Sequence, residues 1–450
     1  MDFKKLAESK REEAIEVLKE LVSFKSVLDE YKPNSDAPFG IEAKRALEYM
    51  LNMAEKDGFK TKNVDNYAGH IEYGEGKETI GILGHLDVVP VAGQVWKTDP
   101  FVADIRDGKL YARGSEDDKG PVVASYFALK ILKEQGIKLN KRVRMILGCD
   151  EESGSRCLTH YFLHEEMPEL GFSPDAEFPV IYGEKAMASY NLFLKEEDDV
   201  ILDFQSGSRL NILPAEAKMK LSVDLVSEFK PWLEENGFDG EYKDGYYYAY
   251  GRSCHGAMPE NGTNGIFILM EFLNDFNPTK ISRYFHDYLT FDPHGNKLGI
   301  DVYDPDMKYL TENVGTANLE DGVLRVGINY RIPKDNYTPF IEKMYEKSFN
   351  GNKNYRYEAL DISEMHYVPR DSFLVETLLN SYRELSGDYT NEPFTIGGGT
   401  YAKFIKNCVA FGPALPGEPD VCHIADEYID IDTFINSIAI YLKAIYDLGK

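Results

Sequence analysis

The hydrophobic positions of the first 150 residues follow helical spacing in some segments and form short apolar runs in others. Apolar side chains recur at helical spacing over 8–24 and 40–57, and a third helix is expected over 121–135. The apolar runs predict strands over 59–64, 70–73, 79–83 and 142–148. Helices and strands that alternate through short connections predict an α/β fold, with a mainly parallel sheet covered by helices on both faces.

The pattern changes near residue 185, where strand-like segments separated by turn residues replace the alternation. The expected strands cover 189–194, 200–204, 218–223, 242–250 and 323–331, and a helix is expected over 265–274. Alternation returns after residue 369. Because 450 residues exceed what one hydrophobic core usually supports, we expect two domains. Residues 1–184 and 370–450 form a discontinuous domain, and 185–369 form an inserted α+β domain.

Charge and composition exclude several classes of partner. The chain has 50 basic and 76 acidic side chains, for a net charge of −26, and no basic stripe that would bind nucleic acid. The same balance argues against anionic membrane surfaces, and no segment approaches the roughly 18 apolar residues of a membrane span. Five cysteines without a CxxC pair suit a reducing compartment. We therefore expect a cytoplasmic protein.

Polar clusters follow several of the predicted core elements. His85 and Asp87 come after the strand at 79–83, Asp117 comes just before the helix at 121–135, and Glu151 and Glu152 come after the strand at 142–148. With Asp175 and His423 they provide the nitrogen and oxygen donors that a pair of zinc-like cations needs. Taken singly, each cluster has an ordinary explanation, such as helix capping or solvated charge. Their order and location predict a dinuclear metal hydrolase.

Two adjacent glutamates at the end of a strand point in different directions. One of them can bind a metal ion while the other reaches the attacking water molecule. A general base is needed there, because the proton of that water must still move to the leaving amine.

Two further patterns are weaker. His160 and His164 are spaced as a helical zinc pair, but no neighbouring residue provides a third ligand, so ordinary surface histidines are the favoured interpretation. The glycine run at 397–399 lacks the Lys-Ser/Thr of a P-loop. A backbone nest that receives a substrate anion explains it better.

Motifs along nearly the whole chain resemble one known family. The chain is similar to the dinuclear zinc aminoacylase/carboxypeptidase metallopeptidases, and most of all to their PepV-type bacterial dipeptidases. The resemblance rests on GHLDVVP (84–90), YARG (111–114), DDKGP (117–121), DEESGS (150–155), SPD (173–175), NILP (211–214), HGAMPENG (255–262) and GGGTY (397–401).

This resemblance implies roles for individual residues. One zinc ion would be bound by His85 and Asp175, the other by Glu152 and His423, and Asp117 would bridge them. Glu151 would be the general base, and Asp87 would orient His85. In the inserted domain, which the resemblance identifies as a lid, His255 would stabilise the oxyanion. The residues implied in substrate binding are Asn211, Arg331, Gly398 and Gly399.

The expected activity is the hydrolysis of unblocked dipeptides, so the substrate is a small peptide. The enzyme is expected to be a monomer with two zinc ions per chain. The same ligand set would also accept manganese or cobalt. Two alternatives stay open: a deacylase of N-acyl amino acids, and a non-catalytic binding protein of the same fold. The preferred dipeptide does not follow from the sequence.

Overall fold

The computed structural model describes residues 1–195 and 197–450. The chain divides into two compact units. Unit 1 comprises 1–183, 366–395 and 399–450, and unit 2 comprises 184–365 and 396–398. Each unit has its own cluster of buried hydrophobic residues. Among the described residues, no helix has both the length and the apolar character needed to cross a bilayer.

Unit 1 is built on a sheet of nine strands. The sheet has the order β1-β2-β6-β3-β7-β24-β9-β22, with β23 paired to β9. Its four central strands, β6, β3, β7 and β24, run parallel, and the strands next to them pair antiparallel. The bounds are β1 Lys60–Val64, β2 Ala68–Tyr73, β3 Thr79–His85, β6 Arg142–Gly148, β7 Leu170–Ser173, β9 Ile181–Glu184, β22 His366–Tyr367, β23 Phe394–Ile396 and β24 Cys408–Ala410.

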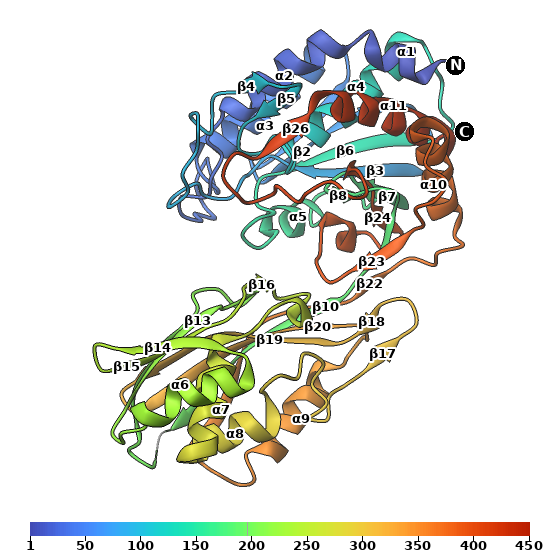
Figure 1. The fold of residues 1–450 in the computed structure, drawn as a ribbon. Helices are drawn as coiled ribbons and strands as arrows, with labels where there is room; N and C mark the ends of the chain where they lie inside the picture. The colour runs from blue at the N-terminus through green and yellow to red at the C-terminus, as the bar shows by residue number, and fades with distance from the viewer. Residues whose placement is uncertain (196) are drawn as a thin grey trace. The chain divides into compact units, whose positions relative to one another are not determined.

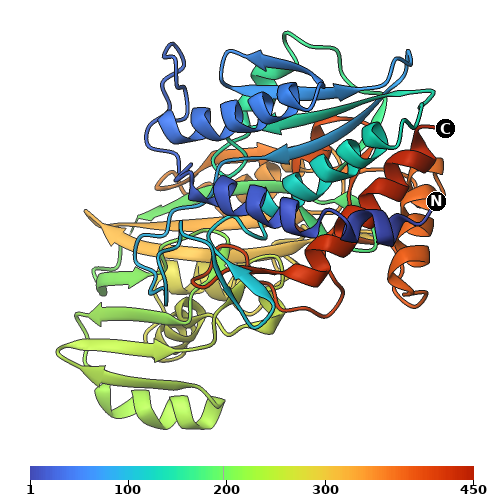
Figure 2. The same ribbon diagram turned by 90° about the horizontal axis from the view of Figure 1, so that it is seen from above.

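Helices cover both faces of this sheet. In Figure 1, α4 and α11 lie above it and α5 lies below. The helix bounds are α1 Phe3–Glu8, α2 Arg11–Ser23, α3 Ile41–Lys56, α4 Lys119–Glu134, α5 Arg156–Tyr161, α10 Phe373–Ser386 and α11 Ile431–Leu448. All seven residues of β3 are buried, as expected of a central strand with helices on both sides. Both termini lie at the same end of the unit, where α1 packs against α11 (Figure 2). The expected α/β fold is confirmed.

Small sheets complete unit 1. One joins β26, β5 and β4, and another pairs β25 with β8. Their bounds are β4 Asp104–Arg106, β5 Lys109–Tyr111, β8 Ala176–Glu177, β25 Pro413–Ala414 and β26 Tyr428–Asp430. A 3-10 helix, η2, covers Tyr401–Phe404.

Unit 2 contains an eight-stranded antiparallel sheet in the order β14-β15-β13-β11-β19-β20-β10-β21. Its strands are β10 Ala186–Lys195, β11 Ile201–Ser206, β13 Glu216–Leu221, β14 Asp239–Lys243, β15 Tyr246–Tyr250, β19 Thr311–Glu320, β20 Val323–Ile332 and β21 Tyr355–Ser363. Two short pairs are β12 Ile212–Leu213 with β16 Cys254–His255, and β17 Tyr303–Asp304 with β18 Lys308–Tyr309. The predicted hairpin at 242–250 is β14 and β15, and its turn residues Asp244 and Gly245 both have positive φ.

The helices of unit 2 are less visible in the sequence. The helix expected at 265–274 is α7 (Gly265–Phe276). Three further helices were not predicted from the residue pattern: α6 (Val226–Asn236), α8 (Lys280–Tyr288) and α9 (Thr338–Ser348). Pro231 lies inside α6, and proline ordinarily signals the end of a helix. The α6 helix continues through Pro231 because the burial of Phe229, Trp232 and Leu233 stabilises it.

Candidate metal centre

The centre is built at one edge of the unit 1 sheet, where three parallel strands end side by side. His85 is the last residue of β3 and pairs with Gly148, the last residue of β6. Glu151 and Glu152 follow β6, and Asp175 follows β7 on the other side of β3. Because the carboxyl ends of parallel strands meet at the same edge, residues far apart in the chain are brought together there.

Asp117 lies between two histidines. Its Oδ1 is 2.9 Å from Nε2 of His85, and its Oδ2 is 2.9 Å from Nε2 of His423. Asp117 precedes α4, whereas His423 comes from the loop before β26. One carboxylate therefore reaches two imidazoles through different oxygen atoms.

Two groups of three potential ligands result. His85, Asp117 and Asp175 form the first, and Asp117, Glu152 and His423 form the second; within each group the ligand atoms lie within 4.8 Å of one another. Nε2 of His85 is 3.6 Å from Asp175, and Nε2 of His423 is 3.2 Å from Glu152. One imidazole with two carboxylates is a ligand set that zinc-like cations take, and the shared Asp117 is the carboxylate that a two-cation site requires. The residues present therefore fit a pair of divalent cations.

The electrostatics of the centre favour added positive charge. Burial raises the pKa of Asp175 to about 6 and that of Glu152 to about 7, and the negative charge of Asp117 adds to both shifts. Hydrogen bonds to Asp117 and Glu152 raise the pKa of His423 to about 11. Burial alone would lower the pKa of His85, but its hydrogen bonds to Asp117 and Asp175 outweigh burial and hold that pKa well above its ordinary value. The crowded carboxylates are therefore stabilised by nearby positive charge. Metal ions that bind here would displace the protons that His85 and His423 carry on their Nε2 atoms.

Asp87 holds the segment that carries the two glutamates. Its carboxylate oxygens accept the backbone N–H groups of Glu151 and Glu152, each at 3.0 Å. Its backbone carbonyl lies 3.0 Å from Nδ1 of His85, while the carboxylate is 3.5 Å from that nitrogen. Because a carbonyl only accepts, Nδ1 of His85 donates and Nε2 is left to face Asp117.

Other buried carboxylates fix the backbone around Asp117. Glu427, fully buried, forms an ion pair with Arg113 at 2.5 Å and accepts the backbone N–H groups of Glu116 and Asp117 at 3.0 and 3.2 Å. Asp118 accepts the backbone N–H of His85 at 3.0 Å. The ion pair of Glu427 and Arg113 is not evident from the sequence, because an acid four residues after His423 carries no local signal of such a partner. These contacts hold Asp117 in place from outside the ligand groups.

His423 has a strained backbone. Its φ is +63°, in the left-handed region that is uncommon for residues other than glycine, although asparagine, aspartate and histidine adopt it more often than the others. Its backbone carbonyl accepts a hydrogen bond from the Gln94 side chain at 2.7 Å. Such conformations persist where the surroundings enforce them, and they concentrate at functional sites.

Three candidate residues of unit 2 lie at the short β12–β16 pair and in β20 of the eight-stranded sheet. His255 pairs with Ile212 across β12 and β16, and the carbonyl of Asn211 accepts the N–H of Gly256 at 2.8 Å. Arg331 in β20 is buried and donates to the carbonyl of Gly397 at 2.8 Å. Burial lowers the pKa of Arg331 to about 10. Asn211 therefore lies beside the His255 segment, and Arg331 lies beside the glycine run.

The glycine run is divided between the units. Gly397 and Gly398 belong to unit 2, whereas Gly399 belongs to unit 1. A Cβ atom on Gly397 would lie 3.1 Å from Cβ of Ala257 and 3.6 Å from Cγ of Arg331. Glycine at 397 thus lets the backbone approach the arginine and the residues after His255 closely.

Proteins with related sequences match nearly the whole length of the chain. The model of "Peptidase family M20/M25/M40" matches residues 81–447. A protein of Bacillus subtilis (strain 168) named "Putative dipeptidase YtjP" is 41% identical over 460 residues, covering 98% of each chain. A "Putative dipeptidase" of Staphylococcus epidermidis is 39% identical and covers 96% of each chain.

Solved structures share the fold at low sequence identity. Human carnosine dipeptidase 1 aligns with a TM-score of 0.61 and 17% identity, covering 99% of this chain and 98% of the human chain. The dipeptidase Dug1p of Saccharomyces cerevisiae aligns with a TM-score of 0.59 and 14% identity, over 99% of this chain and 98% of the yeast chain.

Proposed function

This chain belongs to peptidase family M20/M25/M40, and we propose that it is a dipeptidase that uses two zinc ions to hydrolyse unblocked dipeptides. The chain is a metal-dependent peptidase by its family. The printed names of its relatives support the dipeptidase assignment, since the two compared above are both named putative dipeptidases and each covers at least 96% of this chain.

The observation that carries the proposal is the position of Asp117 between His85 and His423, with 2.9 Å to each imidazole. We assign His85, Asp117 and Asp175 to one cation and Asp117, Glu152 and His423 to the other. When bound, such a pair lowers the pKa of a water molecule and polarises the peptide carbonyl.

We assign Glu151 as the general base. Burial raises the pKa of its carboxyl well above the ordinary value, which suits a group that takes up a proton at neutral pH. The Glu151 carboxylate would take the proton of the attacking water and deliver it to the amine that leaves. Asp87 fixes the backbone of this residue through the 3.0 Å hydrogen bond to its N–H. The base is therefore held by the same side chain that holds Glu152.

We assign substrate binding to residues of unit 2, which we propose is a lid domain. Nδ1 of His255 accepts the N–H of Ala257 at 3.3 Å, so in the neutral ring the proton is on Nε2. An Nε2–H group is the donor that a developing oxyanion needs. Arg331, with Asn211 and Gly398, would bind the substrate carboxylate, since a guanidinium can grip a carboxylate through two hydrogen bonds. We assign Gly399, which belongs to unit 1, to the same role.

A turnover panel on metal-free enzyme reconstituted with zinc, manganese or cobalt tests the proposal. Dipeptides with a free amino group should be hydrolysed, and tripeptides and N-acetyl or N-succinyl amino acids should be poor substrates. A chelator should abolish the activity, and added zinc should restore it. Preferred cleavage of the N-acyl amino acids would instead make the chain a deacylase, and no turnover of any of them would favour a binding protein.

A further inference from the structure

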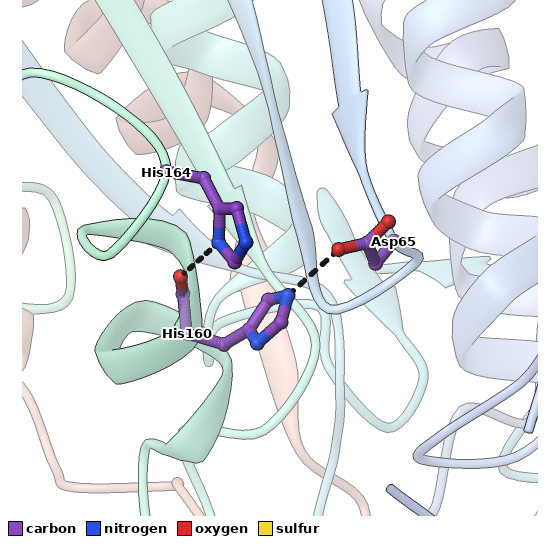
Figure 3. Close-up of side chains that lie close together, drawn as sticks. All are labelled: Asp65, His160 and His164. Atoms are coloured by element: carbon purple, nitrogen blue, oxygen red, sulfur yellow. Dashed lines mark hydrogen bonds and ion pairs between the residues drawn. The ribbon is translucent and has the colours of Figure 1, made fainter. Parts of the chain in front are cut away.

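A third cluster of potential metal ligands lies on the surface of unit 1, and it shares no residue with the centre described above. Asp65, His160 and His164 place one ligand atom each within 4.8 Å of one another (Figure 3). Asp65 is in the turn between β1 and β2, His160 is in α5, and His164 follows α5. The sequence shows the histidine pair but not the carboxylate, which is 95 residues away from His160 in the chain.

The first contact in this cluster joins His160 to Asp65. Nε2 of His160 lies 2.9 Å from Oδ2 of Asp65. The ring of His160 stacks on Tyr67, with 4.0 Å between ring centroids and an interplanar angle of 21°. The stacking fixes the plane of the imidazole, so the direction of Nε2 is set before any ion arrives.

The second contact sets the proton of His164. Its Nδ1 lies 2.9 Å from the backbone carbonyl of His160. A carbonyl only accepts, so Nδ1 carries the hydrogen and the lone pair of the neutral ring is on Nε2. Metal-binding histidines usually donate their second N–H to a carbonyl or carboxylate in this way. Figure 3 shows the other ring nitrogen of His164 on the edge that faces His160 and Asp65.

The turn that carries Asp65 is also held in place. Asp65 and Asn66 have φ of +53° and +57°. The Asn66 N–H donates to the Asn63 side chain at 2.8 Å, and the Asn63 side-chain amide donates back to Asn66 at 2.7 Å. Asp65 and His164 are exposed and His160 is half-buried, so water can complete a coordination sphere. Two imidazoles and a carboxylate, with open positions, form a ligand set for a divalent transition metal ion.

We propose that Asp65, His160 and His164 form a separate surface site for a zinc-class divalent ion, which ties the end of α5 to the turn between β1 and β2. Since α5 begins at Arg156, directly after the loop that carries Glu151 and Glu152, the ion stabilises the element that follows the catalytic loop. The site does not depend on the proposed function, because its ligands are not residues of the dinuclear centre.

The test counts zinc ions per chain in tag-free, full-length protein by equilibrium dialysis at a buffered micromolar free-zinc concentration, followed by elemental analysis. We compare the wild type with His164→Ala and Asp65→Asn. Each variant should hold one zinc ion fewer than the wild type and hydrolyse dipeptides at the wild-type rate. Zinc should also raise the melting temperature of the wild type more than that of either variant.

His286→Ala is the matched control, because this exposed histidine also pairs with a carboxylate, Glu271 at 2.7 Å, but belongs to no group of three potential ligands among the residues that the structure describes. It should bind as many zinc ions as the wild type. Equal zinc counts in the wild type and His164→Ala would overturn the proposal, as would an equal loss in His286→Ala.

Discussion

Oδ1 of Asp87 accepts a hydrogen bond from the backbone N–H of Glu151 at 3.0 Å. Asp87 is buried and follows β3, and Glu151 follows the neighbouring strand β6. The contact therefore joins the ends of two parallel strands at the edge of the sheet where the proposed metal ligands lie. The second oxygen of the same carboxylate accepts the N–H of Glu152 at 3.0 Å. Asp87, two residues after His85 in the chain, thus positions the proposed base and a proposed ligand together.

Asp87→Asn should weaken metal binding. The amide that replaces one carboxylate oxygen would turn an N–H group toward a backbone N–H, so one of the two hydrogen bonds is lost. We expect a fall in metal affinity of about 10–100-fold, measured by competition with a chromophoric chelator. Asp99→Asn is the control, because the Asp99 carboxylate also accepts a backbone N–H, from Phe101 at 2.9 Å, but in an exposed loop. Equal affinities in the two variants would contradict the positioning role of Asp87.

Asp117→Ala should remove both metal ions, because each ligand group then loses a carboxylate. Asp175→Ala should affect only the ion held with His85, since Asp175 belongs to one group. Elemental analysis after gel filtration measures both results. Two ions retained at normal affinity in Asp117→Ala would disprove the bridge.

Glu151→Gln should keep the metal ions and the substrate affinity but lose turnover by about 10²–10⁴-fold, the usual contribution of general acid–base catalysis. Steady-state kinetics and metal content are measured on the same sample. Glu152→Gln is the informative comparison, because it should lose metal. If metal content fell in Glu151→Gln and stayed normal in Glu152→Gln, the two roles would be exchanged.

His255→Ala should keep full metal content while turnover falls by about 10²–10³-fold and KM changes little, as expected when one oxyanion donor is removed. His286→Ala, a histidine substitution elsewhere in unit 2, should retain normal turnover. Near-normal turnover in His255→Ala would leave this residue with a structural role only.

His70 should make the fold sensitive to acid. Burial, together with the positive charge of Arg144, lowers its pKa from 6.5 to about 4, and its Nδ1 is 2.7 Å from the hydroxyl of Tyr161. Between these pH values the unfolded chain binds a proton that the folded chain does not, so stability is present at neutral pH and is lost as pH falls from 6.5 toward 4. The loss attributable to His70 is at most about 3 kcal/mol.

Denaturant unfolding of metal-free wild type and His70→Gln across this pH range measures the effect. The difference in unfolding free energy between the two proteins should change with pH, because only the wild type has the His70 proton equilibrium. A difference that is constant between pH 4 and pH 6.5 would show that His70 does not contribute to acid sensitivity.

The family, the fold class and the order of the potential ligands follow from the sequence. A buried parallel strand is a short apolar run, and a polar residue directly after such a run must lie at the carboxyl edge of the sheet. For that reason the sequence alone predicts that His85 and the glutamates at 151 and 152 share one site. The motifs that carry the family resemblance extend over most of the chain, and the family match covers 81–447.

The family resemblance implied which donors form the dinuclear centre, but only the tertiary structure decided which atoms face one another. Asp117 reaches His423 across 306 positions of sequence, and Glu427 reaches Arg113 across 314, because the final loop of the chain returns to the start of α4. Asp65 is also distant in the sequence from His160 and His164, and the fold brings it close enough to complete a group of three potential ligands. Local spacing governs the periodicity of helices and strands, whereas contacts between distant segments depend on how strands are ordered in the sheet and where their loops cross. Neither the order of the strands nor the positions of the loops can be read from the spacing of residues in the sequence.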